Sequence, residues 1–266
     1  MIAIFDSGLG GLTALLELTK LMPRENITYF GDTGRVPYGS RSREIIMKYS
    51  RQDMRFLLTH DIDAVLIACG TVSSVALDTL REEYAPLPIV GVISGAAKRA
   101  AEATKNGIIG VIATSTTINS QSYTKAIGKI NPSLTVVGAA CPLFVSLVEN
   151  NFIADDDEVT YLVAQRYLQP IKDSGADTLI LGCTHFPIIA PVIQKVLPGV
   201  TLINSGKEAA VELSQIIAAK RPNSPETAGK IKYYISDTPQ NFNATAAIFL
   251  NRSIESETEK IDIELY

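Results

Sequence analysis

Two segments of the sequence each end an apolar run in a cysteine that is followed by polar residues. In LIACGT this cysteine is Cys69, and in LILGCTHF it is Cys183, two positions before His185. Such a thiol could be a buried structural group, a metal ligand, a redox centre or a catalytic group. A cysteine after an apolar strand is most often structural, and we assign Cys141, in GAACPLF, to that class.

The two segments belong to a longer internal repeat. An aspartate stands six positions before each cysteine, in DAVLIAC (63–69) and DTLILGC (177–183). A second apolar run ending in Ser-Gly follows each, IVGVISG and TLINSG. Two matched segments in the same order predict a duplicated half. Because ligands bind beyond the carboxyl ends of parallel strands, two such halves would place the cysteines opposite each other across a cleft.

Inversion of a stereocentre explains this pair of thiols better than the other chemistries do. Asp6, Cys69, Cys183 and His185 could bind zinc, but the sequence has no CxxC or HxxxH pair, and such spacing is usual in structural zinc sites and redox dithiols. Acyl transfer by Cys183 and His185 gives Cys69 no role. A racemase uses both thiols, because one removes a proton and the other returns one to the opposite face. Asp6 and His185 are the candidates for assisting them, and hydroxyls and helix N-termini would hold a carboxylate.

The glycine-rich turn DSGLGG (6–11) does not predict a dinucleotide site. The third glycine of GxGxxG would fall at Thr13, so the fingerprint fails, and the glycines more simply permit a tight turn and close approach of a small anion. The chain has no GxxxxGK[ST] motif, and no lysine directly ends an apolar strand. We therefore expect neither a nucleotide nor pyridoxal phosphate, and no cofactor.

Strand-like runs alternate with segments of helical period along the chain. Strands are predicted at 2–5, 27–30, 64–68, 89–92, 108–112, 134–137, 178–181 and 200–203. Helices are predicted at 12–21, 43–59, 73–84, 94–103 and 120–130, with a helical region ending at 168 and a loop at 220–230. This alternation predicts an α/β fold of two pseudo-symmetric lobes, each a mostly parallel sheet flanked by helices, with the active site in the cleft between them. We expect residues 1–95 and 207–266 in lobe one and residues 96–206 in lobe two.

The composition is that of an ordinary soluble globular protein. Hydrophobic residues make up 46% and charged residues 20%, and the net charge is −4, so we expect no nucleic-acid binding. The longest apolar runs have strand length, so we expect no membrane span. The N-terminus MIAIFDSG lacks a basic region and a long apolar stretch, and three cysteines fit a reducing compartment; both features favour the cytoplasm.

Six segments resemble bacterial glutamate racemases, in the cofactor-independent aspartate/glutamate racemase superfamily. In the order of that family they are FDSGLGGLT, YFGDTGRVPYGSRS, LIACGT, ATSTTINSQSY, CPLFVSLVE and LILGCTHFP. The resemblance runs from Ile2 to about Ile216. It implies an isomerase that converts L- and D-glutamate without a cofactor, at a site between two α/β lobes, and supplies D-glutamate for peptidoglycan. A homodimer is compatible with it.

The resemblance also implies roles for individual residues. Cys69 and Cys183 match the two catalytic thiols, Asp6 and His185 match the groups that assist them, and Glu149 matches an acidic residue near the histidine. The implied substrate contacts are Asp6, Ser7, Tyr38, Gly39, Gly70, Thr71, Thr114, Thr117, Thr184 and His185, and no metal ligand is implied. Taken without the resemblance, Tyr38 and Glu149 could equally be surface or loop residues, and Thr114 a helix N-cap.

The sequence departs from the family pattern beside one of the thiols. The usual Cys-Asn-Thr reads Cys69-Gly70-Thr71, so an amide side chain is missing. Loss of a hydrogen bond to a charged ligand typically costs about 1.5–3 kcal/mol, which bears on affinity and on the choice of glutamate. The alternatives are a racemase of aspartate or another small amino acid, and a binding or regulatory protein that has kept the fold. Gly34 and Asn204 are further departures.

Overall fold

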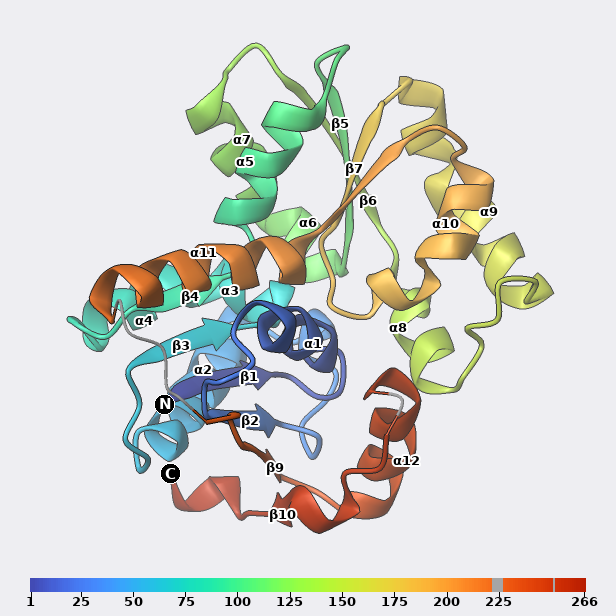
Figure 1. The fold of residues 1–266 in the computed structure, drawn as a ribbon. Coiled ribbons are helices and arrows are strands. Elements are labelled where there is room, and N and C mark those ends of the chain that lie inside the picture. The colour runs from blue at the N-terminus through green and yellow to red at the C-terminus, as the bar shows by residue number, and fades with distance from the viewer. Residues whose placement is uncertain (222–226, 251) are drawn as a thin grey trace.

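Two parallel sheets form the core of the protein, seen here in a computed structural model that describes residues 1–221, 227–250 and 252–266 (Figure 1). The six-stranded sheet has the order β10-β9-β2-β1-β3-β4 and the four-stranded sheet the order β6-β5-β7-β8. The strands of the first are β1 Ile2–Asp6, β2 Ile27–Gly31, β3 Ala64–Ile67, β4 Ile89–Gly91, β9 Ile231–Ile235 and β10 Thr258–Lys260. Those of the second are β5 Ile108–Ala113, β6 Thr135–Ala140, β7 Thr178–Leu181 and β8 Thr201–Asn204.

Helices cover both faces of each sheet, as a parallel sheet requires (Figure 1). In the first part of the chain they are α1 Leu12–Leu21, α2 Arg43–Leu57, α3 Gly70–Val75, α4 Leu77–Glu83, α5 Ser94–Ala103, α6 Ser115–Ser120 and α7 Ser122–Ile130. They continue with α8 Pro142–Glu149, α9 Glu158–Ser174, α10 Ala190–Val196, α11 Ser205–Lys220 and α12 Pro239–Leu250. Short 3-10 turns are η1 Tyr38–Ser40, η2 Phe186–Ile189, η3 Glu255–Glu257 and η4 Ile263–Leu265. The predicted α/β class with two helix-flanked parallel sheets is confirmed.

The internal repeat in the sequence has a counterpart in the sheet topology. Strands β2-β1-β3-β4 and β6-β5-β7-β8 follow the same order, and every pairing among them is parallel. The two aspartate-to-cysteine segments therefore contain equivalent strands, β3 and β7. Both sheets lie within the ranges predicted for the two lobes, whose boundaries at 95/96 and 206/207 stay a prediction.

Alternation of side chains along β1 illustrates how the core is built. Ile2 and Ile4 pack toward α1 and α11, whereas Ala3 and Phe5 pack toward α2 and α3, and all four are fully buried. A strand buried on both faces has no polar side, which explains the continuous apolar run in the sequence. Helix α11 also packs against α5, so it contacts both halves of the molecule (Figure 1).

Several predicted helices are wrong in extent. The predicted helix 73–84 is two helices, α3 and α4, with a break at Ala76, and α3 already begins at Gly70. The helix predicted around 120–130 is confirmed as α7, but the sequence did not predict α6 before it, and Gln121 between the two adopts a left-handed conformation. The helical region expected to end at 168 consists of α8 and α9, and α9 continues to a left-handed Gly175, a usual helix C-terminus.

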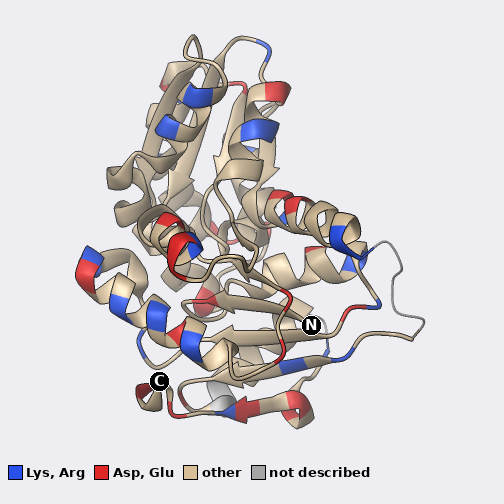
Figure 2. Ribbon diagram, turned by 90° about the vertical axis from the view of Figure 1, so that its left-hand side faces the viewer, with Lys and Arg blue, Asp and Glu red and all other residues tan. Residues whose placement is uncertain are grey.

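The C-terminal segment extends the six-stranded sheet beyond the repeat. Strand β9 pairs with β2 and strand β10 with β9, and the sequence patterns predicted neither of them. In the predicted loop 220–230, Lys220 ends α11, and residues 222–226 lie outside the described residues. None of the helices in the described part of the chain is long and apolar enough to span a bilayer. Basic and acidic residues are mixed over both halves (Figure 2).

Candidate active site

One cavity of about 280 Å³ lies where strands of both sheets end. Its wall is built by the segments that follow β1, β2 and β3 of the six-stranded sheet and β5, β6 and β7 of the four-stranded sheet. This is the edge at which parallel sheets bind ligands. The cavity is lined by Ser7, Val36, Pro37, Tyr38, Gly39, Ser40, Cys69, Gly70, Thr71, Thr114, Ser115, Pro142, Val145, Ser146, Glu149, Gly182, Cys183, Thr184 and His185.

The structure brings most of the predicted site residues together in this wall. The exceptions are Asp6 and Thr117, which are buried directly behind it. The sequence reasoning did not single out the lining residues Val36, Pro37, Ser40, Ser115, Pro142, Val145, Ser146 and Gly182. All of them lie within the segments that carry the family resemblance, so their closeness in sequence to the motif residues could have identified them as lining residues.

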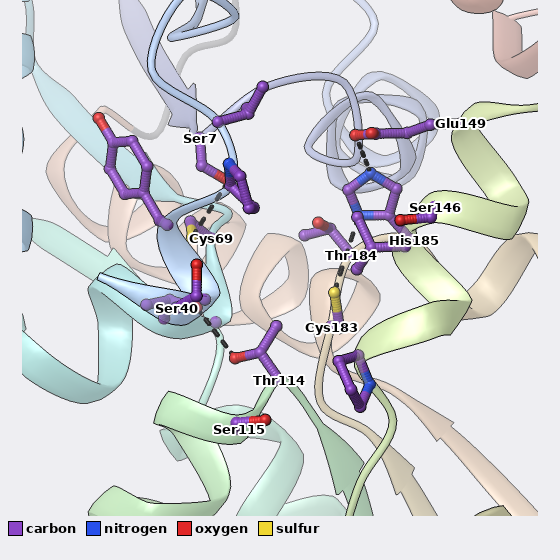
Figure 3. A pocket seen from close by; sticks show the side chains of 18 of the residues that line it. Ser7, Ser40, Cys69, Thr114, Ser115, Ser146, Glu149, Cys183, Thr184 and His185 are labelled. Carbon is purple, nitrogen blue, oxygen red and sulfur yellow. Dashed lines mark hydrogen bonds and ion pairs between the residues drawn. The ribbon is translucent and has the colours of Figure 1, made fainter. Parts of the chain in front are cut away.

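Cys69 lies on the six-stranded side of the cavity, two residues after the end of β3 and at the N-cap of α3. Its thiol is 5% exposed and donates to Ser7 Oγ over 3.6 Å (Figure 3). Burial, reinforced by the nearby Asp6 charge, raises the pKa of Cys69 to about 12. Because a buried thiolate is unfavourable next to a carboxylate, Cys69 holds its proton at neutral pH.

Asp6 is a fully buried carboxyl group at the end of β1. Its Oδ2 accepts the Gly8 N–H at 3.0 Å, and in the described part of the structure its Oδ1 has no hydrogen-bond partner. Burial raises the pKa of Asp6, although the charge of His185 and the N–H groups of Gly11 and Gly8 act in the opposite direction. A buried carboxyl group with one free oxygen beside a thiol can exchange or stabilise a proton there.

Cys183 lies on the four-stranded side, after β7, and is 7% exposed. Its Sγ is 3.7 Å from His185 Nδ1, and His185 Nε2 is 3.0 Å from Glu149 Oε1 (Figure 3). Burial would lower the pKa of His185, but its hydrogen bonds to Cys183 and Glu149 outweigh that effect and raise the pKa to about 10. His185 therefore places a positive charge next to the Cys183 sulfur at neutral pH.

Three threonine hydroxyls form a chain along the cavity wall. Thr114 Oγ1 lies 3.0 Å from Thr71 Oγ1 and donates to Thr117 Oγ1 at 3.0 Å. Thr114 is also the N-cap of α6, where its hydroxyl accepts the Thr117 N–H. The two interpretations of Thr114 are therefore compatible, because the same side chain caps a helix and borders the cavity.

A buried ion network holds the loop between β2 and α2 in place. Arg35 donates to Asp32 at 2.6 Å and to Asp53 at 3.0 Å, and it also contacts Glu264 near the C-terminus at 3.4 Å. The Tyr38 hydroxyl donates to Asp32, and it lies 3.2 Å from the Asp53 carboxylate. Tyr38 thus borders the cavity while its hydroxyl is engaged in this network, so its structural role is to fix the loop.

Side chains that could bind a metal do not gather in the part of the chain that the structure describes: no group of three or more His, Cys, Asp or Glu residues has suitable positions there. The four side chains considered for zinc in the sequence occupy this site as two separate pairs. One is Asp6 with Cys69, and the other is Cys183 with His185. The arrangement offers proton transfer from two sides of one cavity.

Comparison with known proteins gives a consistent result. The profile of the Asp/Glu/hydantoin racemase family matches residues 33–213. A glutamate racemase of Neisseria meningitidis is 42% identical over 255 residues, which cover 96% of this chain and 94% of that protein. A crystal structure of a glutamate racemase isoform from Bacillus anthracis superimposes with a TM-score of 0.93 at 35% identity, covering 98% of this chain and 97% of the other. The glutamate racemase of Francisella tularensis in complex with D-glutamate gives 0.92 at 35% identity, with coverage of 100% and 98%.

Proposed function

Since this chain belongs to the Asp/Glu/hydantoin racemase family, we propose that it is a glutamate racemase that inverts Cα by proton transfer between two thiols. The observation that carries the proposal is the pair of free thiols, Cys69 and Cys183, that border one cavity from different sheets. Each has its own ionisable neighbour, Asp6 or His185. An amino-acid racemase needs one base and one acid in this relation.

In the first step, the Cys183 thiolate removes the Cα proton of the substrate. The pair of electrons from the C–H bond stays on the substrate as a carbanion, and the sulfur becomes a thiol. His185 stabilises the thiolate before this step, because its imidazolium lies next to the sulfur. Glu149 keeps the imidazole protonated through its hydrogen bond to Nε2.

In the second step, the Cys69 thiol donates its proton to the opposite face of Cα. Its raised pKa keeps that proton available at neutral pH, and transfer to a carbanion is downhill. Turnover exchanges the two protonation states, so Cys69 ends as thiolate and Cys183 as thiol. The same residues then serve the reverse reaction, or the resting state is restored by proton exchange through Asp6, His185 and solvent.

The cavity suits a single amino acid. A volume of about 280 Å³ is just below the usual range of ligand cavities, roughly 300–1,000 Å³. Hydroxyl groups on several sides of it, among them Ser7, Thr71, Thr114 and Thr184, can donate to carboxylate oxygens. The choice of glutamate is supported by the relatives named above, one of which is in complex with D-glutamate.

The proposal extends to the cellular role. A glutamate racemase supplies D-glutamate for peptidoglycan, which places this protein in cell-wall biogenesis and the maintenance of cell shape. We expect a cytoplasmic enzyme that acts on a free amino acid without a cofactor, and a homodimer is compatible with this role.

The test is solvent exchange at Cα. The purified protein with L-glutamate in deuterated water, and without added cofactor, should yield D-glutamate that carries deuterium at Cα, detected by chiral chromatography with mass spectrometry. Aspartate, alanine and glutamine tested in parallel should react much more slowly. If neither racemisation nor exchange occurs with any of them, the enzymatic proposal is wrong. If aspartate is turned over faster than glutamate, aspartate is the substrate.

A further inference from the structure

The C-terminal part of the chain lies behind one wall of the cavity. Strand β9 pairs with β2, so its end lies beside the loop between β2 and α2, which is called the cavity loop below (residues 32–42). Residues 36–40 of this loop line the cavity, whereas among the residues that the structure describes none after His185 does so. The C-terminal segment can therefore affect the cavity only through the loop that it supports.

Ser236, the first residue after β9, bonds both the backbone and a buried carboxylate of the cavity loop. Its hydroxyl accepts the Gly34 N–H at 2.9 Å and donates to Asp32 Oδ1 at 2.7 Å. Next to it, the Asp237 N–H donates to Thr33 Oγ1 at 3.1 Å. These bonds join segments that are 202 to 204 positions apart in the sequence.

Asp32 connects Ser236 with the cavity wall. The Asp32 side chain is fully buried, and its second oxygen, Oδ2, accepts Arg35 Nε at 2.6 Å and the Tyr38 hydroxyl. The two oxygens of a carboxylate turn together, so the bond from Ser236 to Oδ1 fixes the direction in which Oδ2 faces Tyr38. Without that bond a buried acceptor would lose its donor, and the carboxylate would turn or shift toward another one.

A later part of the C-terminal segment contacts the same network more weakly. Glu264 Oε1 lies 3.4 Å from Arg35 Nη1, and Glu264 Oε2 accepts from Gln52 Nε2 at 3.3 Å. The Glu264 side chain is 59% exposed, and exposed ion pairs contribute little. A hydroxyl that bonds a buried carboxylate is the stronger contact, so the segment acts on the cavity loop mainly through Ser236.

The cavity loop shapes the binding site but does not carry the thiols. Its Tyr38 borders the cavity, and the carbonyl of Gly39 accepts Thr116 Oγ1 of the four-stranded half at 2.7 Å. Cys69 and Cys183 follow β3 and β7 instead. A shift of the loop would therefore weaken contacts that the substrate keeps throughout the reaction, and such a loss raises KM with little change in kcat.

We infer that Ser236 is a positioning residue: with the neighbouring Asp237 N–H, it holds the cavity loop in the position in which Tyr38 and the residues after it enclose the bound amino acid. This role rests on the proposed function, because it requires that the cavity binds an amino acid. It gives the chain beyond Ile216, where the family resemblance ends, a part in substrate binding.

The experiment compares Ser236→Ala with a matched control, Ser174→Ala. Ser174 is also half-buried, and its hydroxyl donates to Ile171 O at 2.6 Å and accepts the Ala176 N–H at 3.3 Å. It lies before β7, at the end of the sheet away from the cavity. Ser236→Ala should raise KM for glutamate by about 3–10-fold, the usual effect of one hydrogen bond, and change kcat by less than about twofold. Ser174→Ala should lower Tm by a similar amount and keep the wild-type KM, and Ser236→Thr, which retains the hydroxyl, should restore KM.

Hydrogen exchange measures the cavity loop independently of catalysis. In Ser236→Ala, the amides of residues 32–42 should exchange about 3–10-fold faster, as followed for each peptide by mass spectrometry. Exchange in α9 should stay at the wild-type rate, and Ser236→Thr should exchange like the wild type. These rates decide about Ser236 even if no amino acid is turned over, so failure of the proposed function and failure of this inference give different results.

An unchanged KM in folded Ser236→Ala, or wild-type exchange of its cavity loop, would overturn the inference. If Ser236→Ala does not fold, Thr33→Val takes its place, because it removes only the bond from the Asp237 N–H, which lies at the surface. Thr33→Val should show the same changes with smaller size. Unchanged exchange of the cavity loop in that variant would also overturn the inference.

Discussion

Cys69 and Cys183 follow equivalent strands, β3 and β7, of two sheets that share one strand order. Beside Cys69 lies Asp6, a fully buried carboxyl group, and beside Cys183 lies His185, whose second nitrogen bonds Glu149. The strand order is symmetric, but the charges that accompany the two sulfurs are opposite in sign. The pKa of Cys69 is therefore raised, whereas Cys183 lies next to a group that carries a positive charge at neutral pH.

This difference shows what a duplicated fold does and does not supply. Duplication of the strand order provides two thiols at the carboxyl edges of two sheets, directed at one cavity. A two-base reaction also needs the two sulfurs in different protonation states before the substrate arrives, since two thiols or two thiolates could not both remove and return a proton. The ionisable groups beside the two sulfurs differ in charge, and the predictions below alter these groups one at a time.

Removal of either sulfur should have the largest effect. Cys69→Ser and Cys183→Ser should each lower racemisation by about 10²–10⁴-fold, the usual contribution of a positioned acid or base. Each variant keeps one thiol, so residual exchange of the Cα proton with solvent should favour one enantiomer, and the two variants should favour opposite enantiomers. Nuclear magnetic resonance in deuterated water measures this exchange for L- and D-glutamate separately.

Cys141→Ser is the matched control for this experiment. Cys141 is fully buried and its thiol donates to the Ala139 carbonyl at 3.6 Å, a bond that a serine hydroxyl can also make. Its racemisation rate should equal that of the wild type. Exchange that favours the same enantiomer in both Cys69→Ser and Cys183→Ser would show that the two thiols do not act from opposite faces.

The sequence predicted the features that the two halves share, but few of the features that distinguish the surroundings of the two thiols. Hydrophobic runs of strand length and the repeated Asp-to-Cys spacing predicted the two sheets and the position of both thiols, because these patterns depend on local residue order. The environment of each sulfur also depends on residues far apart in the chain. Asp6 was a candidate from the sequence pattern alone, whereas Glu149 was reached only through the family resemblance.

The C-terminal strands and the surroundings of Gly70 could not be predicted from the sequence for a related reason. Strand β9 pairs with β2 across about two hundred positions, and its alternation is too short to distinguish it from a loop. The sequence indicated only that Gly70 lacks the amide side chain that the family usually has at this position. In the structure the carbonyl of Gly182 fills the space where a side chain would lie, which no pattern in either segment indicates.

Replacement of His185 by glutamine should reduce the difference in charge between the surroundings of the two sulfurs, because it removes the positive charge beside Cys183. Glutamine is neutral at all pH values, so Cys183 loses the positive charge that favours its thiolate. We expect kcat to fall by about 10²-fold and alkylation of Cys183 by iodoacetamide at neutral pH to become slower. The alkylation of Cys69 in the same sample is the control. An unchanged alkylation rate of Cys183 would contradict the assignment.

The same replacement has a defined effect on stability. The pKa of His185 is about 10 in the folded protein against an ordinary value of 6.5, so protonation favours the folded state. This contribution is fully present below about pH 6.5 and decreases as the pH rises through about 10. The difference in free energy of unfolding between wild type and His185→Gln, from urea titrations at several pH values, should shrink over that interval.

Asp6→Asn should have a smaller effect on rate and the opposite effect on stability. Without the carboxyl group, proton exchange at Cys69 slows, and we expect kcat to fall by roughly tenfold, which corresponds to about 1.4 kcal/mol. Burial raises the pKa of Asp6, so the ionised form costs folding free energy at any pH above its ordinary value of 3.8. The neutral amide should therefore raise Tm at neutral pH, and this gain should disappear below about pH 4. A lower Tm at pH 7 would show that the carboxyl group is needed for folding.

Glu149→Gln should give the smallest change, because the Glu149 side chain is 30% exposed and water screens part of its charge. The amide can keep the hydrogen bond to His185 Nε2 but not the negative charge that helps to raise the pKa of that residue. We expect the pKa of His185 to fall below about 10 and kcat to drop a few-fold at neutral pH, since one pKa unit is worth at most tenfold. Because the chain has only two histidines, nuclear magnetic resonance can follow the His185 ring directly, with His60 as an internal control. A lowered pKa of His185 with an unchanged kcat would mean that the charge on the imidazole does not assist proton removal by Cys183. The geometry of the cavity would then be the main source of the difference between the two thiols.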